Sequence, residues 1–120
     1  MTEITASPVP THLLADAATA ELGDWAQLEE ATEERMDARE FALWTGEGGA
    51  EVGVWECTPG PSRWVQDQNE FAYIISGSVT VTADGGGPAR LGPGDALLVP
   101  QGWTGTWDIH ETLRKAYVVF

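Results

Sequence analysis

From Arg39 onward, glycine and proline interrupt this chain at short intervals. The 120 residues include 14 glycines and 7 prolines, and the runs between them are short and rich in valine, isoleucine, phenylalanine and tryptophan. Such runs are typical of β-strands, and the glycines and prolines between them supply the backbone angles of tight turns. The pattern predicts an all-β protein built as an antiparallel sandwich or barrel.

The turn signals divide the chain into nine expected strands, at residues 39–45, 51–57, 63–66, 71–75, 78–82, 89–91, 96–99, 103–109 and 113–120. Ser76-Gly77 is predicted to form a tight hairpin turn. His110 and Glu111 are predicted to lie on the surface, in a turn before the last strand. Residues 12–22 are predicted to form a short helix with Thr11 as its N-cap.

Acidic residues are concentrated at the start of the chain. The formal net charge is −13, and residues 1–56 hold 13 acidic and 2 basic side chains, against 6 and 4 in residues 57–120. We therefore interpret residues 1–38 as an acidic N-terminal arm over a body at residues 39–120. So acidic a chain disfavours nucleic acid and anionic lipid as partners, because both need a basic patch.

Membrane insertion and secretion are not expected either. No apolar run approaches the ~20 residues that span a bilayer, and no basic segment with an apolar core opens the chain. Cys57 is the single cysteine, so it cannot form an internal disulfide, which fits a reducing cytoplasm. We interpret Cys57 as a small buried hydrophobe, because no neighbouring base supports a nucleophile.

Three blocks of sequence lie at residues 53–60, 100–107 and 111–117. Two further spacings, Glu70-x6-Gly77 and Gly94-Asp95-x4-Pro100-x-Gly102, follow the first block, and the latter runs into the second. In this order they resemble the small single-domain cupins of the DUF861 (Cupin_3) branch. That branch includes ureidoglycine aminohydrolase-type and ethanolamine-utilisation cupins. The resemblance covers roughly residues 39–120 and implies a small β-barrel, a double-sheet jelly roll whose mouth holds a ligand or a metal.

The metal ligands that the resemblance implies are mostly missing. The wider cupin family takes two histidines and a glutamate from its first motif and a third histidine from its second. Here Trp64, Gln66 and Gly105 stand at the histidine positions and only Glu70 is kept. Because imidazole makes such sites tight for first-row metals, no cofactor is expected. The alternative is a weak Mn²⁺ or Mg²⁺ site that uses Gln66 and Glu70.

Strand alternation predicts a charged pair inside the barrel. Lys115, the chain's only lysine, shares one face of the last strand with Leu113, Tyr117 and Val119. If that face lines the barrel, Lys115 enters the cavity, where a lysine is costly unless it meets a carboxylate. Glu70 and Lys115 are therefore the predicted catalytic pair. The alternative is that Lys115 reaches out to solvent and the contact is structural.

Aromatic residues surround the two cupin motifs. The predicted ligand-binding residues are Trp64, Gln66, Tyr73, Trp103, Trp107 and Tyr117, since aromatic walls suit planar, apolar or cationic parts of a ligand. The other tryptophans, Trp25, Trp44 and Trp55, are interpreted as packing residues. A barrel filled by tryptophan is the alternative to an open pocket.

Two functions from different classes remain open at this stage. One is an acid–base enzyme that acts through Glu70 and Lys115 on a small polar, nitrogen-containing metabolite. The other is a non-catalytic cupin that senses or binds a small molecule in the same pocket. In either case a homodimer is expected, because a small barrel exposes strand edges and apolar sheet faces, and the acidic arm is suited to lie across the partner.

Overall fold

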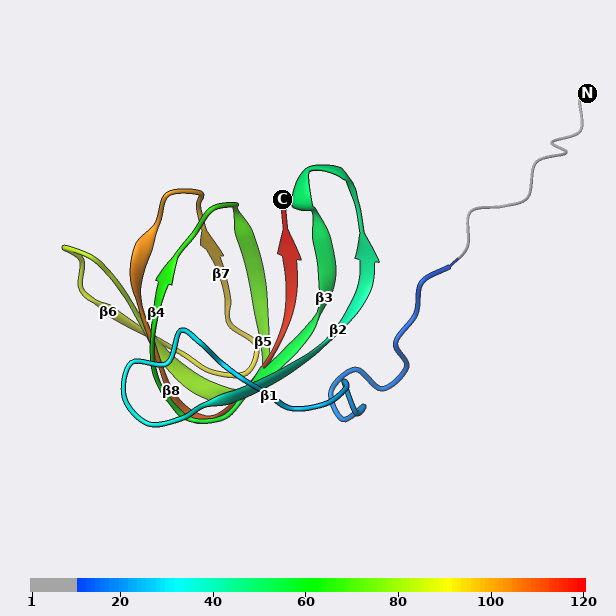
Figure 1. The fold of residues 1–120 in the computed structure, drawn as a ribbon, viewed down its shortest axis with the longest axis horizontal. Helices are drawn as coiled ribbons and strands as arrows, with labels where there is room; N and C mark the ends of the chain where they lie inside the picture. The colour runs from blue at the N-terminus through cyan, green and yellow to red at the C-terminus, as the bar shows by residue number, and fades with distance from the viewer. Residues whose placement is uncertain (1–10) are drawn as a thin grey trace, which may run out of the picture.

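The computed structural model describes residues 11–120, and these form a barrel of antiparallel strands (Figure 1). In chain order the elements are β1 (Ala26–Gln27), β2 (Asp37–Thr45), the 3₁₀ turn η1 (Glu47–Gly49), β3 (Glu51–Cys57), β4 (Gly60–Val65), β5 (Glu70–Ala83), β6 (Pro88–Leu91), β7 (Ala96–Val99) and β8 (Thr104–Val119). No helix within residues 11–120 is long and apolar enough to cross a membrane.

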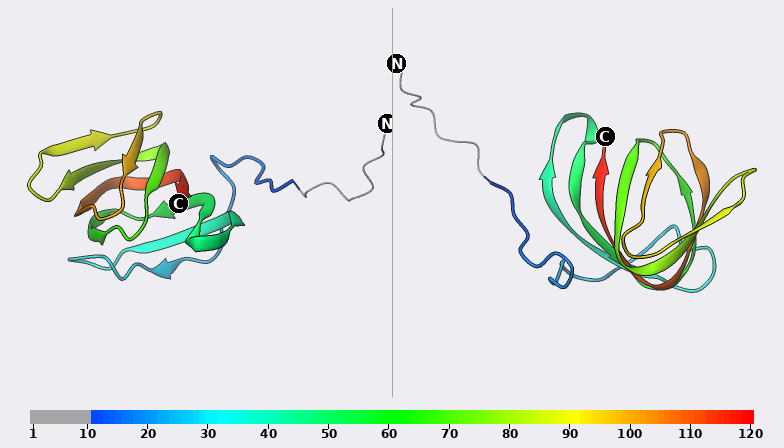
Figure 2. Two further views of the ribbon diagram at one scale, coloured as in Figure 1. Left: turned by 90° about the horizontal axis from the view of Figure 1, so that it is seen from above. Right: turned by 180° about the vertical axis from the view of Figure 1, so that it is seen from behind.

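Two long bent strands build both layers of the barrel (Figures 1 and 2). The first half of β5 and the second half of β8 lie in one layer, where β3 pairs with β8 and β7 pairs with β5. The other halves of the same strands lie in the second layer, with β4 and β6 at its edges. This double-sheet arrangement confirms the predicted all-β jelly roll.

The hairpin predicted at Ser76-Gly77 is wrong, because β5 continues through both residues as one strand. Its pairing with β8 shifts register on either side of Ser76 and again after Ser78, which marks a bulge. Gly77 has φ +86°, and a Cβ there would collide with the carbonyl oxygen of Thr112. A bulge with a glycine at positive φ and a tight turn place the same residue at the same backbone angles, so the glycine alone does not distinguish them.

The predicted turn at His110 and Glu111 is also absent, because both residues lie within β8. His110 is exposed, as expected, and its Nε2 lies 2.7 Å from the Thr80 hydroxyl on β5. The last two predicted strands are therefore one strand of 16 residues.

The predicted helix at residues 12–22 is not formed. A single turn closes around Asp16, whose carbonyl oxygen accepts from the Thr19 and Ala20 amides, and whose φ of +53° is left-handed. A non-glycine residue in that region cannot propagate a right-handed helix. The chain then runs extended toward the base of the barrel.

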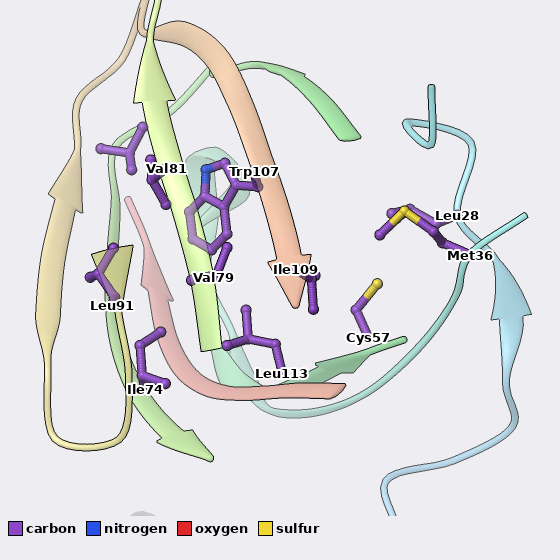
Figure 3. Packing of buried hydrophobic residues seen from close by; sticks show 11 residues of the cluster. Leu28, Met36, Cys57, Ile74, Val79, Val81, Leu91, Trp107, Ile109 and Leu113 are labelled. Carbon is purple, nitrogen blue, oxygen red and sulfur yellow. The ribbon is translucent and has the colours of Figure 1, made fainter. Parts of the chain in front are cut away.

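The segment before β2 is acidic on its outside and anchored by apolar residues. Leu22, Leu28 and Met36 are 3%, 8% and 0% exposed, and Leu28 and Met36 join the core cluster beside Cys57 (Figure 3). The remaining core residues come mainly from β5 and β8, and they are Ile74, Val79, Val81, Leu91, Val99, Trp107, Ile109 and Leu113. The core therefore fills the base of the barrel and includes part of the predicted arm.

The Cys57 thiol is expected to resist alkylation in the folded protein. The residue is fully buried, and this burial raises the pKa of its thiol to about 12, so the reactive thiolate is scarce at pH 8. Iodoacetamide at pH 8 should leave the native protein unmodified by mass and add one label in urea. Labelling of the native protein at the rate of the unfolded one would contradict the buried placement.

An ion-pair network lies across the outside of the barrel base. Glu56 accepts from Arg39 Nε at 2.7 Å and from Arg114 Nε at 3.1 Å. Arg114 is only 3% exposed although it is on the outer face of β8, because the chain around Ala17 covers it and accepts from its Nη1 at 2.8 Å. This network attaches the start of the described chain to the barrel.

The network is expected to lose its stabilising effect in acid. Burial alone raises the pKa of Glu56, but hydrogen bonds and charges from Arg114 and Arg39 outweigh it, so the pKa lies below its ordinary value. A depressed carboxyl pKa stabilises the fold above the unfolded pKa, and this contribution disappears as pH falls. Glu56→Gln should therefore lower the urea midpoint at pH 7, and the difference from the parent should shrink between pH 5 and pH 3. A constant difference would contradict this assignment.

Candidate functional site

A small cavity of about 20 Å³ lies between the two layers above the core, with room for about one water molecule. Four strands supply its lining residues, which are Trp55 from β3, Ser62 and Trp64 from β4, Glu70 from β5, and Trp107, Ile109 and Lys115 from β8, together with Gln66 just after β4. We call this space the inner cavity. The barrel is thus largely filled, though not closed, by tryptophan.

A buried ion pair forms one wall of the inner cavity. Lys115 Nζ lies 2.6 Å from Glu70 Oε2, and the two side chains are only 10% and 14% exposed. The same nitrogen lies 4.5 Å from the ring centroids of both Trp55 and Trp107. A carboxylate and two aromatic faces together stabilise the positive charge of Lys115.

The aromatic walls are fixed in place by hydrogen bonds. Trp64 Nε1 donates to Ser62 Oγ at 2.8 Å, and that hydroxyl donates to the Trp107 carbonyl oxygen at 3.1 Å. Trp55 and Trp64 meet edge to face, with ring centroids 6.4 Å apart and planes at 78°. The orientation of the rings is therefore fixed, and a ligand that enters meets the same ring faces.

A second and larger space of about 160 Å³ opens outside the inner cavity. We call it the outer pocket. It shares Trp55, Trp64, Glu70 and Lys115 with the inner cavity, and its other lining residues are Glu40, Glu51, Tyr117 and Val119. The ion pair thus stands between the two spaces.

Tyr117 brings two carboxylates together in the outer pocket. Its hydroxyl oxygen lies 2.6 Å from Glu51 Oε2 and 2.9 Å from Glu40 Oε2. Burial raises the pKa of Tyr117, and both carboxylates raise it further, so the hydroxyl stays neutral. Gly53 makes room for it, because a Cβ there would lie 2.8 Å from the hydroxyl oxygen.

Most of the residues predicted from the sequence meet at these two spaces. Glu70, Lys115, Trp64, Gln66 and Trp107 line the inner cavity, and Tyr117 lines the outer pocket. Their roles in binding or catalysis stay predictions.

Tyr73 and Trp103 are not among the lining residues. Strand alternation places Glu70 and Ala72 inward on β5, and so Tyr73 points outward and is 45% exposed. Trp103 packs against the core cluster from the end of the turn before β8. Neither residue contacts the space that the sequence assigned to it.

Sequence reasoning did not select Glu40, Glu51 and Trp55 as site residues. The last two alternate inward along β3, and pairing places them opposite Val119 and Lys115. Trp55, interpreted as a packing residue, thus becomes a wall of both spaces. Trp25 and Trp44, given the same interpretation, are 43% and 47% exposed.

The side chains around Glu70 do not fit a metal ion. Within residues 11–120, no three His, Cys, Asp or Glu side chains converge on a point that could hold one. The Lys115 ammonium already holds Glu70 Oε2 and would repel a second cation beside it. At Gly105 a Cβ would collide with the Thr82 carbonyl oxygen, so that position has no space for a ligating side chain.

Comparison with known families supports the cupin fold. The sequence model of the EutQ-like cupin domain, Cupin_3, matches residues 45–117. The chain belongs to the EutQ-like cupin family. Among curated protein sequences, none matches this EutQ-like cupin.

Solved structures support the same family and fold. A DUF861 family protein from Thermotoga maritima is 34% identical over 56% of this chain and 76% of its own, with a TM-score of 0.54. The Clostridium difficile EutQ protein is 21% identical over 71% of this chain and 68% of its own, with a TM-score of 0.62. A putative ethanolamine utilization protein Q from Salmonella typhimurium is 16% identical over 97% of both chains, with a TM-score of 0.66. The last two similarities concern the fold alone.

Proposed function

We propose that this EutQ-like cupin binds a small molecule in the outer pocket, with the Glu70–Lys115 pair as the floor and Trp55 and Trp64 as walls. One observation carries the proposal, namely a charged pair with side chains 10% and 14% exposed beneath a space of about 160 Å³. Well-packed apolar residues often stabilise a fold more than a buried ion pair does. A charged pair at this position therefore favours a role in recognition over one in stability.

The binding site uses no metal in this proposal. Lys115 supplies a positive charge next to Glu70, at 2.6 Å, where a metal would otherwise contact the carboxylate. A fixed ammonium can orient a polar ligand without the imidazole ligands that tight metal sites need. Elemental analysis of the purified protein is expected to show no stoichiometric first-row transition metal, manganese included, and no stoichiometric magnesium.

Native mass spectrometry of the full chain tests the binding function. The parent protein is expected to bind members of a library of small polar, nitrogen-containing metabolites, and Trp64→Ala is expected to lose them. Trp25→Ala is the matched control, because Trp25 is 43% exposed and lines neither space. Failure of the parent to bind any compound, or equal binding by Trp64→Ala, would contradict the proposal.

Acid–base catalysis is the second candidate, favoured by the 2.6 Å contact between Lys115 Nζ and Glu70 Oε2. An ammonium and a carboxylate in contact can donate a proton to a bound polar metabolite and take one back. Conversion of a bound compound, followed by mass spectrometry, would show catalysis. Recovery of the compound unchanged after long incubation would leave recognition as the function.

We also propose a homodimer. It forms through the outer face of the layer that contains β2, β3 and β7 together with the first half of β5 and the second half of β8. Strand pairing sets five apolar residues side by side across that face, in the order Leu98, Phe71, Val118, Val52 and Trp44. Leu98, Trp44 and Phe71 are 59%, 47% and 43% exposed. In a chain of charge −13, two copies can approach most easily at such an uncharged surface.

Light scattering after gel filtration tests the dimer. The parent is expected to elute with twice the chain mass at micromolar concentration, and Phe71→Glu should elute as a monomer. Val65→Glu is the control, because Val65 is an apolar residue on β4 that is 71% exposed. A parent that stays monomeric across micromolar concentrations would contradict this proposal.

A further inference from the structure

We infer that the outer pocket takes a small organic cation, a primary ammonium group on a short apolar chain. This inference rests on the proposed binding function and specifies the class of ligand. It follows from hydrogen-bond donors and acceptors, charge, wall chemistry and volume, all taken from the residues that line the outer pocket.

The one cation of the walls and the Trp64 N–H already have partners. Lys115 Nζ donates to Glu70 at 2.6 Å and lies against two aromatic faces. Trp64 Nε1 donates to Ser62 at 2.8 Å. An anionic ligand would therefore meet a cation whose charge Glu70 already compensates.

The acceptors of the outer pocket exceed its donors. Glu51 Oε2 and Glu40 Oε2 lie 2.6 and 2.9 Å from the same Tyr117 hydroxyl oxygen. A tyrosine hydroxyl has one hydrogen, so it can donate fully to only one of the two carboxylates. The other carboxylate needs a donor from elsewhere, and a ligand that brings its own N–H groups can supply it in place of water, since Glu40 is exposed.

The net charge of the side chains that line the outer pocket also favours a cationic ligand. The outer pocket is lined by the carboxylates of Glu40, Glu51 and Glu70 and by the single ammonium of Lys115, a balance of −3 + 1 = −2. Neutral compounds can donate hydrogen bonds but leave this charge in place. A cationic ligand compensates part of it, and an anionic ligand is repelled.

The remaining walls set the shape and size of the ligand. Trp55, Trp64 and Val119 offer apolar and aromatic surface next to the carboxylates, which suits an alkyl chain and a positive charge near a ring face. A space of about 160 Å³ corresponds to about five water molecules in the liquid. The ligand should accordingly have about as many non-hydrogen atoms.

Three probes that differ in charge test the inference. Binding of butylammonium, butan-1-ol and butanoate to the full chain is measured by calorimetry at pH 7. The ionic strength is about 0.15 M, so that distant charges are screened. Butylammonium is expected to bind at least tenfold more tightly than either other probe. Glu51→Gln and Glu40→Gln should each weaken butylammonium at least tenfold, with unfolding midpoints measured in parallel.

Asp108→Asn is the matched control, because it removes the same charge from an exposed position on β8 outside the outer pocket. It is expected to leave butylammonium binding unchanged, and an equal weakening would reveal general attraction to an acidic protein and overturn the inference. Tighter binding of butan-1-ol or butanoate, lost in Trp64→Ala, would also overturn it while leaving the proposed binding function in place. No binding of any probe would overturn the cation inference, and the metabolite library then decides the binding function separately.

Discussion

Lys115→Met is expected to lower the free energy of unfolding by about 3–5 kcal/mol, the usual cost of leaving one member of a buried ion pair without its partner. Glu70, whose side chain is 14% exposed, would then have no cation beside it. Glu70→Gln should destabilise the protein comparably, because Lys115 would then keep its charge between two tryptophan rings. Urea unfolding followed by far-UV circular dichroism measures both effects.

The double variant Glu70→Gln/Lys115→Met separates loss of the pair from loss of one partner. Replacing both members of a buried pair is often close to neutral, so the double variant should recover much of the loss, and the non-additivity measures the coupling. Arg63→Met is the exposed control, since Arg63 and Asp84 are 46% and 48% exposed, and its urea midpoint should barely move. Single variants as stable as the parent would show that the pair is not isolated from water.

The same two variants test function as well as stability. Glu70 and Lys115 line both the inner cavity and the outer pocket, so each single change alters the floor on which a ligand would rest. Binding should change in opposite directions in the two variants, because Glu70→Gln removes a negative charge and should weaken a cationic ligand, whereas Lys115→Met removes the positive charge and should strengthen it. Binding like that of the parent in both single variants and in the double variant would show that the pair does not belong to the site.

Glycine and proline positions predicted most of the strands, because the local sequence determines where many strands end. The predicted strands at residues 51–57 and 96–99 coincide with β3 and β7, since glycine or proline stands beside each. The same reasoning failed at Gly77, where the positive φ serves a bulge in β5. Whether a glycine turns or bends a strand depends on the partner strand, and this information is not local.

The site was predictable where alternation within one strand was enough. Lys115 and Tyr117 lie two residues apart on β8 and both point inward, as the alternation requires. Glu70 followed from its position in the family motif. These three residues form the floor and one wall of the outer pocket.

The rest of the site depends on register between strands. Glu40 enters the outer pocket because β2 pairs with β3 so that Glu40 lies opposite Trp55, which in turn lies opposite Lys115. These contacts join residues that are far apart in the sequence, and the bulge between Ala42 and Trp44 shifts the register once more. A single sequence contains no direct signal for such a pairing.

Trp107→Ala is expected to lower the free energy of unfolding by about 3–5 kcal/mol, the usual range for removing a large buried aromatic side chain. Trp107 is 6% exposed and belongs to the core cluster, so its loss leaves a cavity between the layers. Urea unfolding measures the effect. Trp25→Ala is the control, because Trp25 also stacks on a cation, with Arg39 at 4.4 Å, but is 43% exposed.

Two milder changes at Trp107 separate packing from attraction to the ammonium. Phenylalanine keeps an aromatic face toward Lys115 Nζ, which lies 4.5 Å from the present ring centroid, whereas leucine fills space without one. A desolvated cation–π contact can contribute about 2 kcal/mol, so Trp107→Phe should be the more stable of the two. In a Lys115→Met background that advantage should disappear, and if it persisted, the ring would stabilise the barrel through packing alone.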